Sequence, residues 1–373
     1  MEKQITIMNK PEALIFFQYL PPWRIDVFNE MAEYYNLTIA FTDADSEGFS
    51  YNKTELLKKL DKRINTVFLK KGFRIKQRPV KFGILRLIKK VKPEIIFSHE
   101  YAPTSVLVAF YRMFFHYRYI ITTSDNLDIA QNVKGLKAIF RKYILNRADA
   151  IVVYSDIVKK WYKKIFPELR AEVCPNIQNP DSLLNYRKLF PPLIKKYKEK
   201  FNITNKSVLL YTGRLEYIKG LDLLLNAFAK SENKDFLLVL VGKGKEDKNL
   251  RQQCVDLKIE GRVVFAGFYT GVNLYAWYDI ADFFILPSRF EPFGAVINES
   301  LVYGCPVLAS KYIGATDLIC NDNGLLFDPL NEKEFIKMLN VFYKRYNHRI
   351  KSGKNLMTLS FKQYVRVFFD VNN

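Results

Sequence analysis

Short apolar runs alternate with stretches of helical periodicity along the first half of this 373-residue chain. The runs are rich in β-branched and aromatic residues, which predicts strands buried in a parallel sheet. They cover residues 13–20, 37–43, 94–98, 119–124 and 150–155. The segments between them have apolar positions at helical spacing and predict helices at residues 23–35, 79–91, 105–115 and 136–147. This alternation predicts an α/β fold with a doubly wound sheet.

The second half repeats the same pattern after an interruption. Strands are predicted at residues 207–213, 236–242, 262–267, 282–288 and 306–310. Between 175 and 205 the alternation breaks, and the segment holds four prolines, so we expect the domain boundary there, between 185 and 186. Two doubly wound domains that face each other leave a cleft, to which each domain offers the C-terminal ends of its strands.

Composition limits the class of protein. Apolar residues make up 49% of the chain, which is enough for large cores and excludes a disordered protein. The four cysteines are scattered and form no C-x-x-C pair, which argues against a disulfide framework and against zinc, and suits a reducing cytoplasm. The first residues do not resemble a signal peptide, and no apolar run approaches the roughly 18 residues of a spanning helix. We therefore expect a protein that does not cross a membrane.

The net charge of +20 bears on partners more than on fold. It is concentrated in residues 53–92, where the only acids are Glu55 and Asp61 and where aromatic and aliphatic residues are interleaved with the cations. Residues 79–92 in this basic stretch have the pattern of an amphipathic helix. A solvated face, an anionic membrane surface and a nucleic acid are all compatible with this charge.

One stretch combines a turn, a helix and two carboxylates. Residues 288–310 read SRFEPFGAVINESLVYGCPVLAS, with Glu291 before a helix that Gly294 is expected to open. Free N–H groups at such a helix start, together with the helix dipole, suit a phosphate. Glu299 lies eight residues after Glu291, about two turns later, on nearly the same face. A carboxylate there can accept two hydrogen bonds from a vicinal diol such as a ribose.

The same stretch resembles the E-x₇-E signature of retaining GT-B glycosyltransferases, specifically glycosyltransferase family four. The segments YTGRLEYIKGLDLLLNAF, LVGKGKEDKNL, VVFAGFYT and YIGATDLICNDNGLLFDPLN resemble further family segments, so that the resemblance covers residues 206–346. It implies a GT-B fold of two Rossmann-like domains facing a central cleft. Residues 1–185 would form the acceptor-side domain and residues 186–356 the nucleotide-sugar-binding domain, with a helix at about 357–373 packing back on the first.

The resemblance also implies roles for single residues. Arg214 and Lys219 would hold the leaving diphosphate, where fixed cations replace a metal ion. Glu291 would hydrogen-bond the donor sugar and Glu299 the ribose. No metal cofactor is expected, and the donor would be a UDP- or GDP-linked sugar. Backbone groups that would contact the sugar nucleotide belong to Gly213, Gly242, Gly244, Phe293, Gly294, Ala295 and Val296.

The first half resembles, more loosely, the opening of a bacterial branch that builds surface polysaccharides. Where other branches have a glycine-rich loop that contacts the diphosphate, this chain has Arg24, a cation that could replace those amides. The family often carries a histidine near the reacting sugar. Ser124, Asp125 and Asn126 occupy the corresponding place, and Asp125 is the expected group that orients the acceptor or the sugar. His99 is a further possible ligand contact.

These features predict a retaining glycosyltransferase that moves a sugar from a nucleotide sugar to a lipid-linked or oligosaccharide acceptor in surface polysaccharide synthesis. O-antigen, capsule and exopolysaccharide remain open. The basic stretch predicts a cytoplasmic protein that binds the inner face of the cytoplasmic membrane peripherally. One alternative is a hydrolysing sugar-nucleotide epimerase of the same architecture. A basic nucleic-acid-binding protein is the other, but no helix-turn-helix, zinc or RRM signature supports it, so no nucleic-acid partner is expected.

Overall fold

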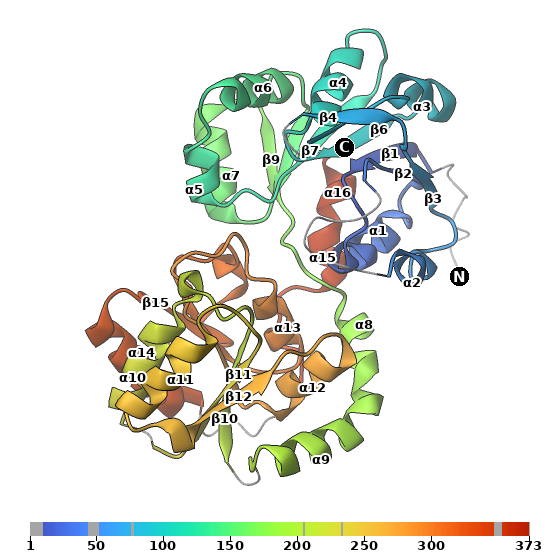
Figure 1. Ribbon diagram of the computed structural model, residues 1–373. Coiled ribbons are helices and arrows are strands. Elements are labelled where there is room, and N and C mark those ends of the chain that lie inside the picture. Colours follow the sequence, from blue (N-terminus) through green and yellow to red (C-terminus); the bar gives the residue numbers. More distant parts are fainter. Residues whose placement is uncertain are drawn as a thin grey trace, which may run out of the picture. The chain divides into compact units, whose positions relative to one another are not determined.

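A computed structural model shows two compact α/β units, each built on a parallel sheet (Figure 1). The first unit comprises residues 1–176 and 361–373, and the second comprises residues 177–360. The predicted α/β class is therefore confirmed. The structure describes residues 10–43, 52–75, 78–203, 206–232, 234–346 and 353–372.

The first unit has a seven-stranded sheet in the order β3-β2-β1-β6-β7-β8-β9, in which every neighbouring pair is parallel. Its central strands are buried along their length because helices cover both faces, which explains their continuous apolar runs. The strands are β1 (Glu12–Phe17), β2 (Asn36–Phe41), β3 (Asn65–Phe68), β6 (Ile95–His99), β7 (Arg118–Thr122), β8 (Ala150–Val153) and β9 (Arg170–Val173).

Two groups of helices cover this sheet (Figure 1). One face carries α3 (Ile84–Val91), α4 (Pro103–Tyr111), α5 (Leu127–Gln131), α6 (Leu136–Leu145) and α7 (Asp156–Ile165), whose apolar side chains form a continuous core with the strands. The other face carries α1 (Ile25–Met31), which follows the 3₁₀ turn η1 (Pro22–Arg24), and the C-terminal helices α15 (Phe361–Val365) and α16 (Val367–Asp370). The short helix α2 (Lys53–Lys58) precedes β3.

The C-terminal segment is held by polar and aromatic contacts within the first unit. The Tyr35 hydroxyl donates to the carbonyl of Phe368 over 2.7 Å, and the rings of Phe97 and Phe368 meet edge to face. The Arg118 guanidinium donates to the carbonyls of Val371 and Asn372. The last described residues of the chain are thus part of the first unit.

Part of the basic stretch folds differently from the prediction. Residues 79–81, expected to begin a helix, lie in an antiparallel hairpin formed by β4 (Gly72–Ile75) and β5 (Arg78–Lys81). The helix α3 starts only at Ile84, after Gly83, whose φ of 94° ends the extended segment. Within α3, Ile84, Leu87 and Ile88 are buried. The prediction of one amphipathic helix over 79–92 was therefore wrong in its first turn. Lys76 lies outside the described residues.

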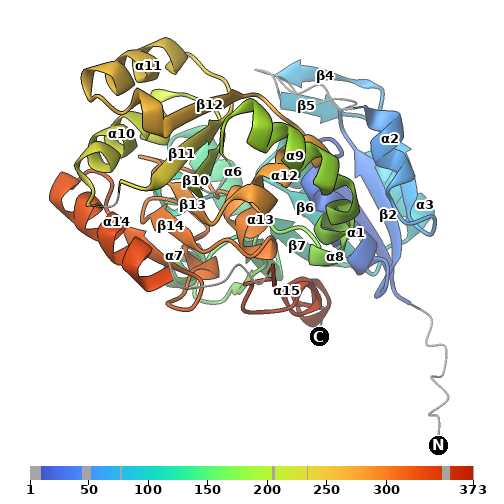
Figure 2. The ribbon, with the colours of Figure 1, turned by 90° about the horizontal axis from the view of Figure 1, so that it is seen from below.

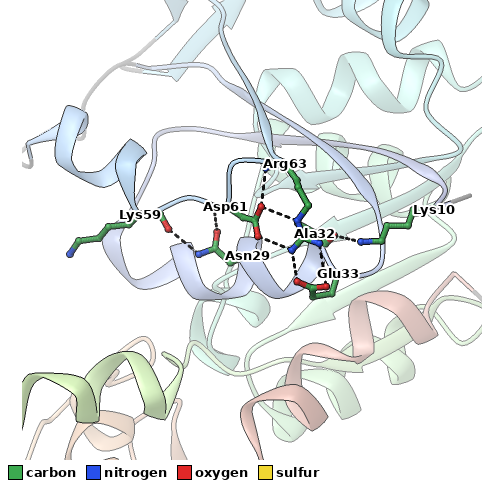
Figure 3. A network of polar contacts seen from close by, with 7 residues as sticks. All are labelled: Lys10, Asn29, Ala32, Glu33, Lys59, Asp61 and Arg63. Atoms are coloured by element: carbon green, nitrogen blue, oxygen red, sulfur yellow. Dashed lines mark hydrogen bonds and ion pairs between the residues drawn. The ribbon is translucent and has the colours of Figure 1, made fainter. Parts of the chain in front are cut away.

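A polar network fixes the loop before β3 on α1 (Figure 3). The side-chain amide of Asn29 donates to the carbonyl of Lys59 over 3.0 Å, and its oxygen accepts from the backbone N–H of Asp61 over 2.8 Å. Arg63 pairs with Asp61 and with Glu33, which lies in the turn after α1. The Arg63 guanidinium lowers the pKa of Asp61 to about 2, so the carboxylate stays charged over the whole physiological range. The edge of the sheet is thereby anchored to the helix layer.

The second unit has a six-stranded sheet in the order β12-β11-β10-β13-β14-β15, also parallel. Five strands lie where the apolar runs predicted them, and the sixth lies within the NGLLF segment. The strands are β10 (Ser207–Thr212), β11 (Phe236–Val241), β12 (Val263–Gly267), β13 (Phe283–Leu286), β14 (Val307–Ser310) and β15 (Gly324–Phe327).

Helices again lie on both sides of this sheet (Figure 2). One side carries α10 (Leu221–Lys230), α11 (Asp247–Asp256) and α14 (Glu332–Tyr346); the other carries α9 (Phe190–Lys200), α12 (Val272–Ile280) and α13 (Val296–Val302). A pair of stacked aromatic rings packs on each side of the sheet: Phe236 stacks on Tyr343, and Tyr197 stacks on Trp277. The remaining elements of this unit are α8 (Pro180–Leu184), η2 (Asn185–Leu189), η3 (Tyr217–Lys219), η4 (Glu260–Arg262) and η5 (Thr316–Leu318).

The division between the units falls at Asn176/Ile177, before the expected boundary at 185/186. The reason is that α8 packs on α13, where the Tyr303 hydroxyl donates to the carbonyl of Leu183 over 2.6 Å. The second unit therefore begins before α8.

Each sheet has one point at which the strand order reverses. In the first unit it lies between β1 and β6, and in the second between β10 and β13. Ligands of doubly wound proteins bind outside the carboxyl ends of the strands at such a point. Arg24 and His99 follow or end the first pair of strands, and Arg214, Lys219 and Glu291 follow the second pair. The strand order therefore brings these predicted site residues to the switch points of their own units.

Candidate active site

The loops after β10 and β11 lie so close together that two positions in the second loop have no room for a side chain. A Cβ on Gly242 would lie 1.8 Å from the carbonyl oxygen of Gly213, and one on Gly244 would lie 2.1 Å from that of Leu215. The N–H of Leu215 donates to the carbonyl of Lys243 over 3.0 Å. These glycines were expected to let the backbone approach a nucleotide. The structure shows a further role for them, which is to let the two loops pack directly on each other.

Lys219 and Glu291 meet at the switch point of the second sheet. The Lys219 ammonium donates to Glu291 Oε2, and both side chains are largely buried, with 12% and 16% exposed. Lys219 ends the turn η3, and Glu291 lies in the loop after β13. The structure therefore brings a predicted diphosphate ligand and a predicted sugar ligand into direct contact.

Arg289 holds these two segments together and was not singled out in the sequence. Its guanidinium forms a two-pronged ion pair with Asp222 of α10, both N···O distances being 2.6 Å, and covers the ring of Tyr217. Its own N–H donates to the carbonyl of Ile218. The Asp222 carboxylate raises the pKa of Arg289, so the pair stays charged. Arg289 is thus a positioning residue for the turn that carries Lys219.

Arg214 is exposed, in contrast to Lys219 and Glu291. Its guanidinium donates to Glu216 Oε1 over 3.0 Å, and 66% of its side chain is accessible to solvent. The carbonyl of Arg214 accepts from the Tyr211 hydroxyl over 2.9 Å, which fixes its backbone while leaving the side chain at the surface. A ligand phosphate must compete with Glu216 for this cation.

The helix of the E-x₇-E stretch begins at Val296, two residues after the predicted start at Gly294. It has only two turns, so the expected phosphate contacts would come from the amides of the turn before it rather than from a long helix dipole. Gly294 has a different role. A Cβ there would lie 3.1 Å from Leu286 and 3.4 Å from the side chain of Glu291, at a φ of 93°. The glycine lets the backbone of Phe293, Gly294 and Ala295 turn beside Glu291.

Glu299 is held by two side chains that the sequence analysis did not identify. Its Oε2 accepts from the Tyr278 hydroxyl over 2.7 Å, and its Oε1 accepts from the Gln178 amide over 3.0 Å. Burial raises the pKa of Glu299, while these two hydrogen bonds act against the rise. A carboxylate has about four acceptor positions. Each oxygen of Glu299 therefore keeps capacity for one hydroxyl of a diol.

Asp125 follows β7 in the first unit and ends a chain of hydroxyl groups. Its Oδ2 accepts from the Tyr162 hydroxyl over 2.9 Å, and the Tyr101 hydroxyl lies 2.7 Å from that of Tyr162. Burial raises the pKa of Asp125 to about 6, and the charge of Glu100 adds to the rise. This carboxyl group can therefore hold or release a proton near neutral pH.

Glu100 organises the loop that contains Asp125 and was missed in the sequence, although it directly follows His99. It accepts from the N–H of Ser124 over 2.8 Å, from the Ser124 hydroxyl over 2.5 Å and from the Thr123 hydroxyl over 3.1 Å. It has a φ of 61°, an uncommon value for a residue with a side chain. The N–H and the hydroxyl of Ser124 are thus both hydrogen-bonded to Glu100. Asn126 caps α5, accepting from the N–H of Ile129 over 2.9 Å.

His99 lies parallel to the ring of Phe17, with 4.1 Å between the ring centroids. Its Nδ1 is 2.9 Å from the Thr122 hydroxyl, and its Nε2 is 3.4 Å from Glu100. Burial, together with the positive charge of Arg24, lowers the pKa of His99 to about 3. The imidazole is therefore neutral at physiological pH and can exchange hydrogen bonds without carrying charge.

Arg24 is buried, with 2% of the residue exposed. Its guanidinium lies 5.6 Å from the ring centroid of Tyr154 and 5.9 Å from that of Phe368. Its Nε and Nη1 atoms are buried without a hydrogen-bond partner in the structure. The expected direct contact with a diphosphate would require these atoms to become accessible, so in this conformation Arg24 acts on its surroundings through its charge.

The described residues contain no group of three or more His, Cys, Asp or Glu side chains placed to hold a metal ion. In the same part of the chain, none of the helices has the length and apolar character needed to span a bilayer.

Comparison with known proteins supports the family. Residues 194–356 match the family Glycosyl transferases group 1. An uncharacterized glycosyltransferase of Methanocaldococcus jannaschii is 32% identical over 177 residues, which are 44% of this chain and 45% of the relative. The alpha-monoglucosyldiacylglycerol synthase of Streptococcus pneumoniae is 27% identical over 194 residues, 46% of this chain and 44% of that protein. The chain thus spans less than half the length of these two curated relatives.

Solved structures resemble the chain over nearly its whole length. A glycosyltransferase from Rickettsia africae has a TM-score of 0.72 at 20% identity, covering 98% of each chain. Anabaena HepE, crystallised with UDP, has a TM-score of 0.68 at 20% identity, covering 97% of this chain and 96% of that one. At this identity the likeness shows the fold. By these comparisons residues 194–356 match the glycosyl transferases group 1, and the chain has the GT-B fold.

Proposed function

We propose that this protein is a retaining glycosyltransferase that transfers a sugar from a nucleotide sugar to a hydroxyl group of an acceptor. The observation that carries the proposal is the contact between Lys219 and Glu291 at the switch point of the second sheet. It joins a cation suited to a diphosphate with a carboxylate suited to sugar hydroxyls, at the edge where doubly wound proteins bind nucleotides. The family match of residues 194–356 covers both residues.

In this proposal the donor binds to the second unit. Lys219 and Arg214 stabilise the charge that develops on the leaving diphosphate, so no metal ion is needed. Glu291 accepts from hydroxyls of the donor sugar, and Glu299 accepts from the ribose. The backbone amides of residues 293–296 donate to sugar and phosphate oxygens, and the loops that Gly213 and Gly242 join form the floor beneath the nucleotide.

The acceptor binds to the first unit. Asp125, whose pKa is raised to about 6, orients the acceptor hydroxyl or the donor sugar, and neutral His99 offers a further hydrogen bond. Ser124 and Asn126 act less directly, since Glu100 and the start of α5 occupy their side chains. Arg24 contributes positive potential near the diphosphate. Retention follows from front-face attack, in which the leaving phosphate accepts the proton of the acceptor hydroxyl.

The acceptor is proposed to be a lipid-linked glycan of a bacterial surface polysaccharide. Two observations support a lipid. The curated relative from Streptococcus pneumoniae is by name a synthase of a glycosylated diacylglycerol. In addition, residues 53–92 carry the concentrated positive charge and expose Phe73, Ile75 and Phe82. This combination suits peripheral binding to an anionic membrane.

A panel of nucleotide sugars tests the donor half of this proposal. A ligand that binds only the native state raises the melting temperature by mass action. We expect one UDP- or GDP-linked sugar to raise the melting temperature more than the other members of the panel, and its free nucleoside diphosphate to raise it less. A panel in which no nucleotide or nucleotide sugar changes the melting temperature would contradict the assignment.

A further inference from the structure

A cavity lies in the first unit, at the carboxyl ends of β2 and β3, and its described lining shares no residue with the groups around Asp125. Its volume is about 470 Å³, within the range of small-molecule sites. Four cations line it: Lys53, Lys70, Arg74 and Lys81. Two of these come from the hairpin β4–β5, which folds over the end of the sheet.

The hairpin is built to present its cations to the cavity. Gly72 pairs with Lys81, and Arg74 is two residues from Gly72, so the side chains of Arg74 and Lys81 share one face of the ribbon. A Cβ on Gly72 would lie 2.2 Å from the carbonyl oxygen of Val80, so only glycine permits this close pairing. The position of both cations thus follows from the hairpin backbone.

One buried carboxylate fixes the cationic wall. Asp43 has 7% of its side chain exposed, and its Oδ1 lies 2.9 Å from the Arg74 guanidinium and 3.8 Å from the Lys81 ammonium. Its Oδ2 accepts from the Gln18 amide over 3.2 Å. Asp43 is the single acid among the described residues that line the cavity, against four cations. The described part of the lining therefore carries a surplus of positive charge.

Apart from Thr42, the rest of the described lining is apolar and aromatic. Lys53 lies with its ammonium 3.5 Å from the ring centroid of Phe68, and Phe41 and Leu69 complete this wall. Phe41 stacks on Phe68 with 5.2 Å between the centroids, which keeps the wall in place. A ligand that fits must therefore combine a multiply charged anion with a carbon skeleton.

We propose that this cavity binds a phosphate or diphosphate group of the acceptor, with the attached carbon chain against Phe68. The inference rests on the proposed transfer reaction and deepens it. A carboxylate sugar carries one negative charge, whereas a phosphate monoester carries about 1.5 to 2 at neutral pH and a diphosphate carries more. Only the phosphate classes match the surplus charge. The carbon chain can come from a sugar phosphate or from a lipid carrier.

The test measures binding calorimetrically in the presence of saturating UDP or GDP, which blocks the donor site. The two probes are inorganic pyrophosphate and farnesyl diphosphate. The variants are Lys53→Gln and Lys70→Gln, which leave both contacts of Asp43 in place. Lys89→Gln, at an exposed position on α3 outside the cavity, is a matched control because it removes the same charge.

We expect each cavity variant to weaken pyrophosphate binding about tenfold, since a charge-assisted hydrogen bond is lost, and the control to leave it unchanged. Tighter binding of farnesyl diphosphate than of pyrophosphate would assign the site to a lipid carrier. Equal binding would assign it to a phosphate group irrespective of its chain.

No binding of either probe to the nucleotide-saturated protein would overturn the inference, as would equal losses in Lys89→Gln and the cavity variants. Binding of UDP and GDP to the same proteins is measured separately. Failure of both nucleotides to bind would contradict the proposed donor site without changing what the lysine variants report about the cavity.

Discussion

Two carboxylates of the E-x₇-E stretch sit in different surroundings, and each predicts its own ligand preference. Glu299 is held by Tyr278 and Gln178, whereas Glu291 contacts Lys219 directly. Glu299→Gln is expected to weaken the bare nucleoside diphosphate about tenfold, since a charge-assisted hydrogen bond to the ribose is lost. Glu291→Gln is expected to weaken the nucleotide sugar and to spare the bare nucleotide. Calorimetry with both ligands checks this, and equal losses in both variants would refute the assignment.

At the same scale, Asp125 predicts a dependence of stability on pH. Its pKa of about 6 exceeds the ordinary value of about 3.9 in an unfolded chain, so the native state binds the proton more tightly. Its contribution to the free energy of unfolding is therefore present near pH 4 and is lost as the pH rises through 6. Asp125→Asn should remove a fall on the order of 2 kcal/mol across this interval.

Urea unfolding at pH 4.5 and pH 7 measures this fall. Asp128→Asn is the control, because this exposed carboxylate lies three residues away on α5. If the wild type and Asp125→Asn lose the same free energy of unfolding between the two pH values, the folded protein does not raise the pKa of Asp125.

Strands that are buried on both faces were predicted from the sequence, and largely exposed strands were missed. The central strands β1, β6, β7, β10 and β11 are continuous apolar runs because helices cover both faces. The edge strand β3 and the hairpin strand β4 are largely exposed, so their sequences carry little apolar signal. Hydrogen bonds to neighbouring strands make them strands, and such long-range pairing cannot be recognised in a local pattern.

The residues of the candidate site likewise fall into those that a local pattern indicated and those that it did not. Motif spacing identified Glu291, Glu299 and Lys219, because the resemblance extends through them. It missed Tyr278 and Gln178, which reach Glu299 from distant parts of the chain. Those contacts depend on tertiary packing rather than on the spacing of a motif.

Close packing of the β10 and β11 loops gives an element-scale prediction. In Gly242→Ala the new Cβ would meet the carbonyl oxygen of Gly213 at 1.8 Å, so one loop must move. We expect a loss of at least about 2 kcal/mol in the free energy of unfolding. This corresponds to a fall in melting temperature of roughly 4 °C or more for a unit of this size.

Gly261→Ala is the matched control, since its Cβ would meet no atom within 4 Å. Calorimetric melting of both variants checks the prediction. Similar melting temperatures for Gly242→Ala and Gly261→Ala would show that the loops are not packed as described.

For the whole molecule, the charge of +20 and its concentration in residues 53–92 predict reversible membrane binding. Each Lys or Arg near an anionic surface contributes about 1 kcal/mol, and added salt screens this attraction. The protein should co-sediment with vesicles that contain phosphatidylglycerol, and should be released by salt. Charge reversal at Lys70 and Lys71 should reduce vesicle binding while nucleotide binding stays unchanged. Equal partitioning to neutral and anionic vesicles would refute an electrostatic membrane role.

The central claim is that protein cations, without a metal ion, stabilise a leaving diphosphate. The direct measurement is release of nucleoside diphosphate from the preferred nucleotide sugar in excess EDTA, by the wild type and by Arg214→Ala and Lys219→Ala. We predict that the wild type keeps its rate and that each variant loses about 2–4 kcal/mol of transition-state stabilisation, or roughly 30- to 1,000-fold in rate. Normal turnover in both variants, or loss of the wild-type rate in EDTA with rescue by Mg²⁺ or Mn²⁺, would contradict the account.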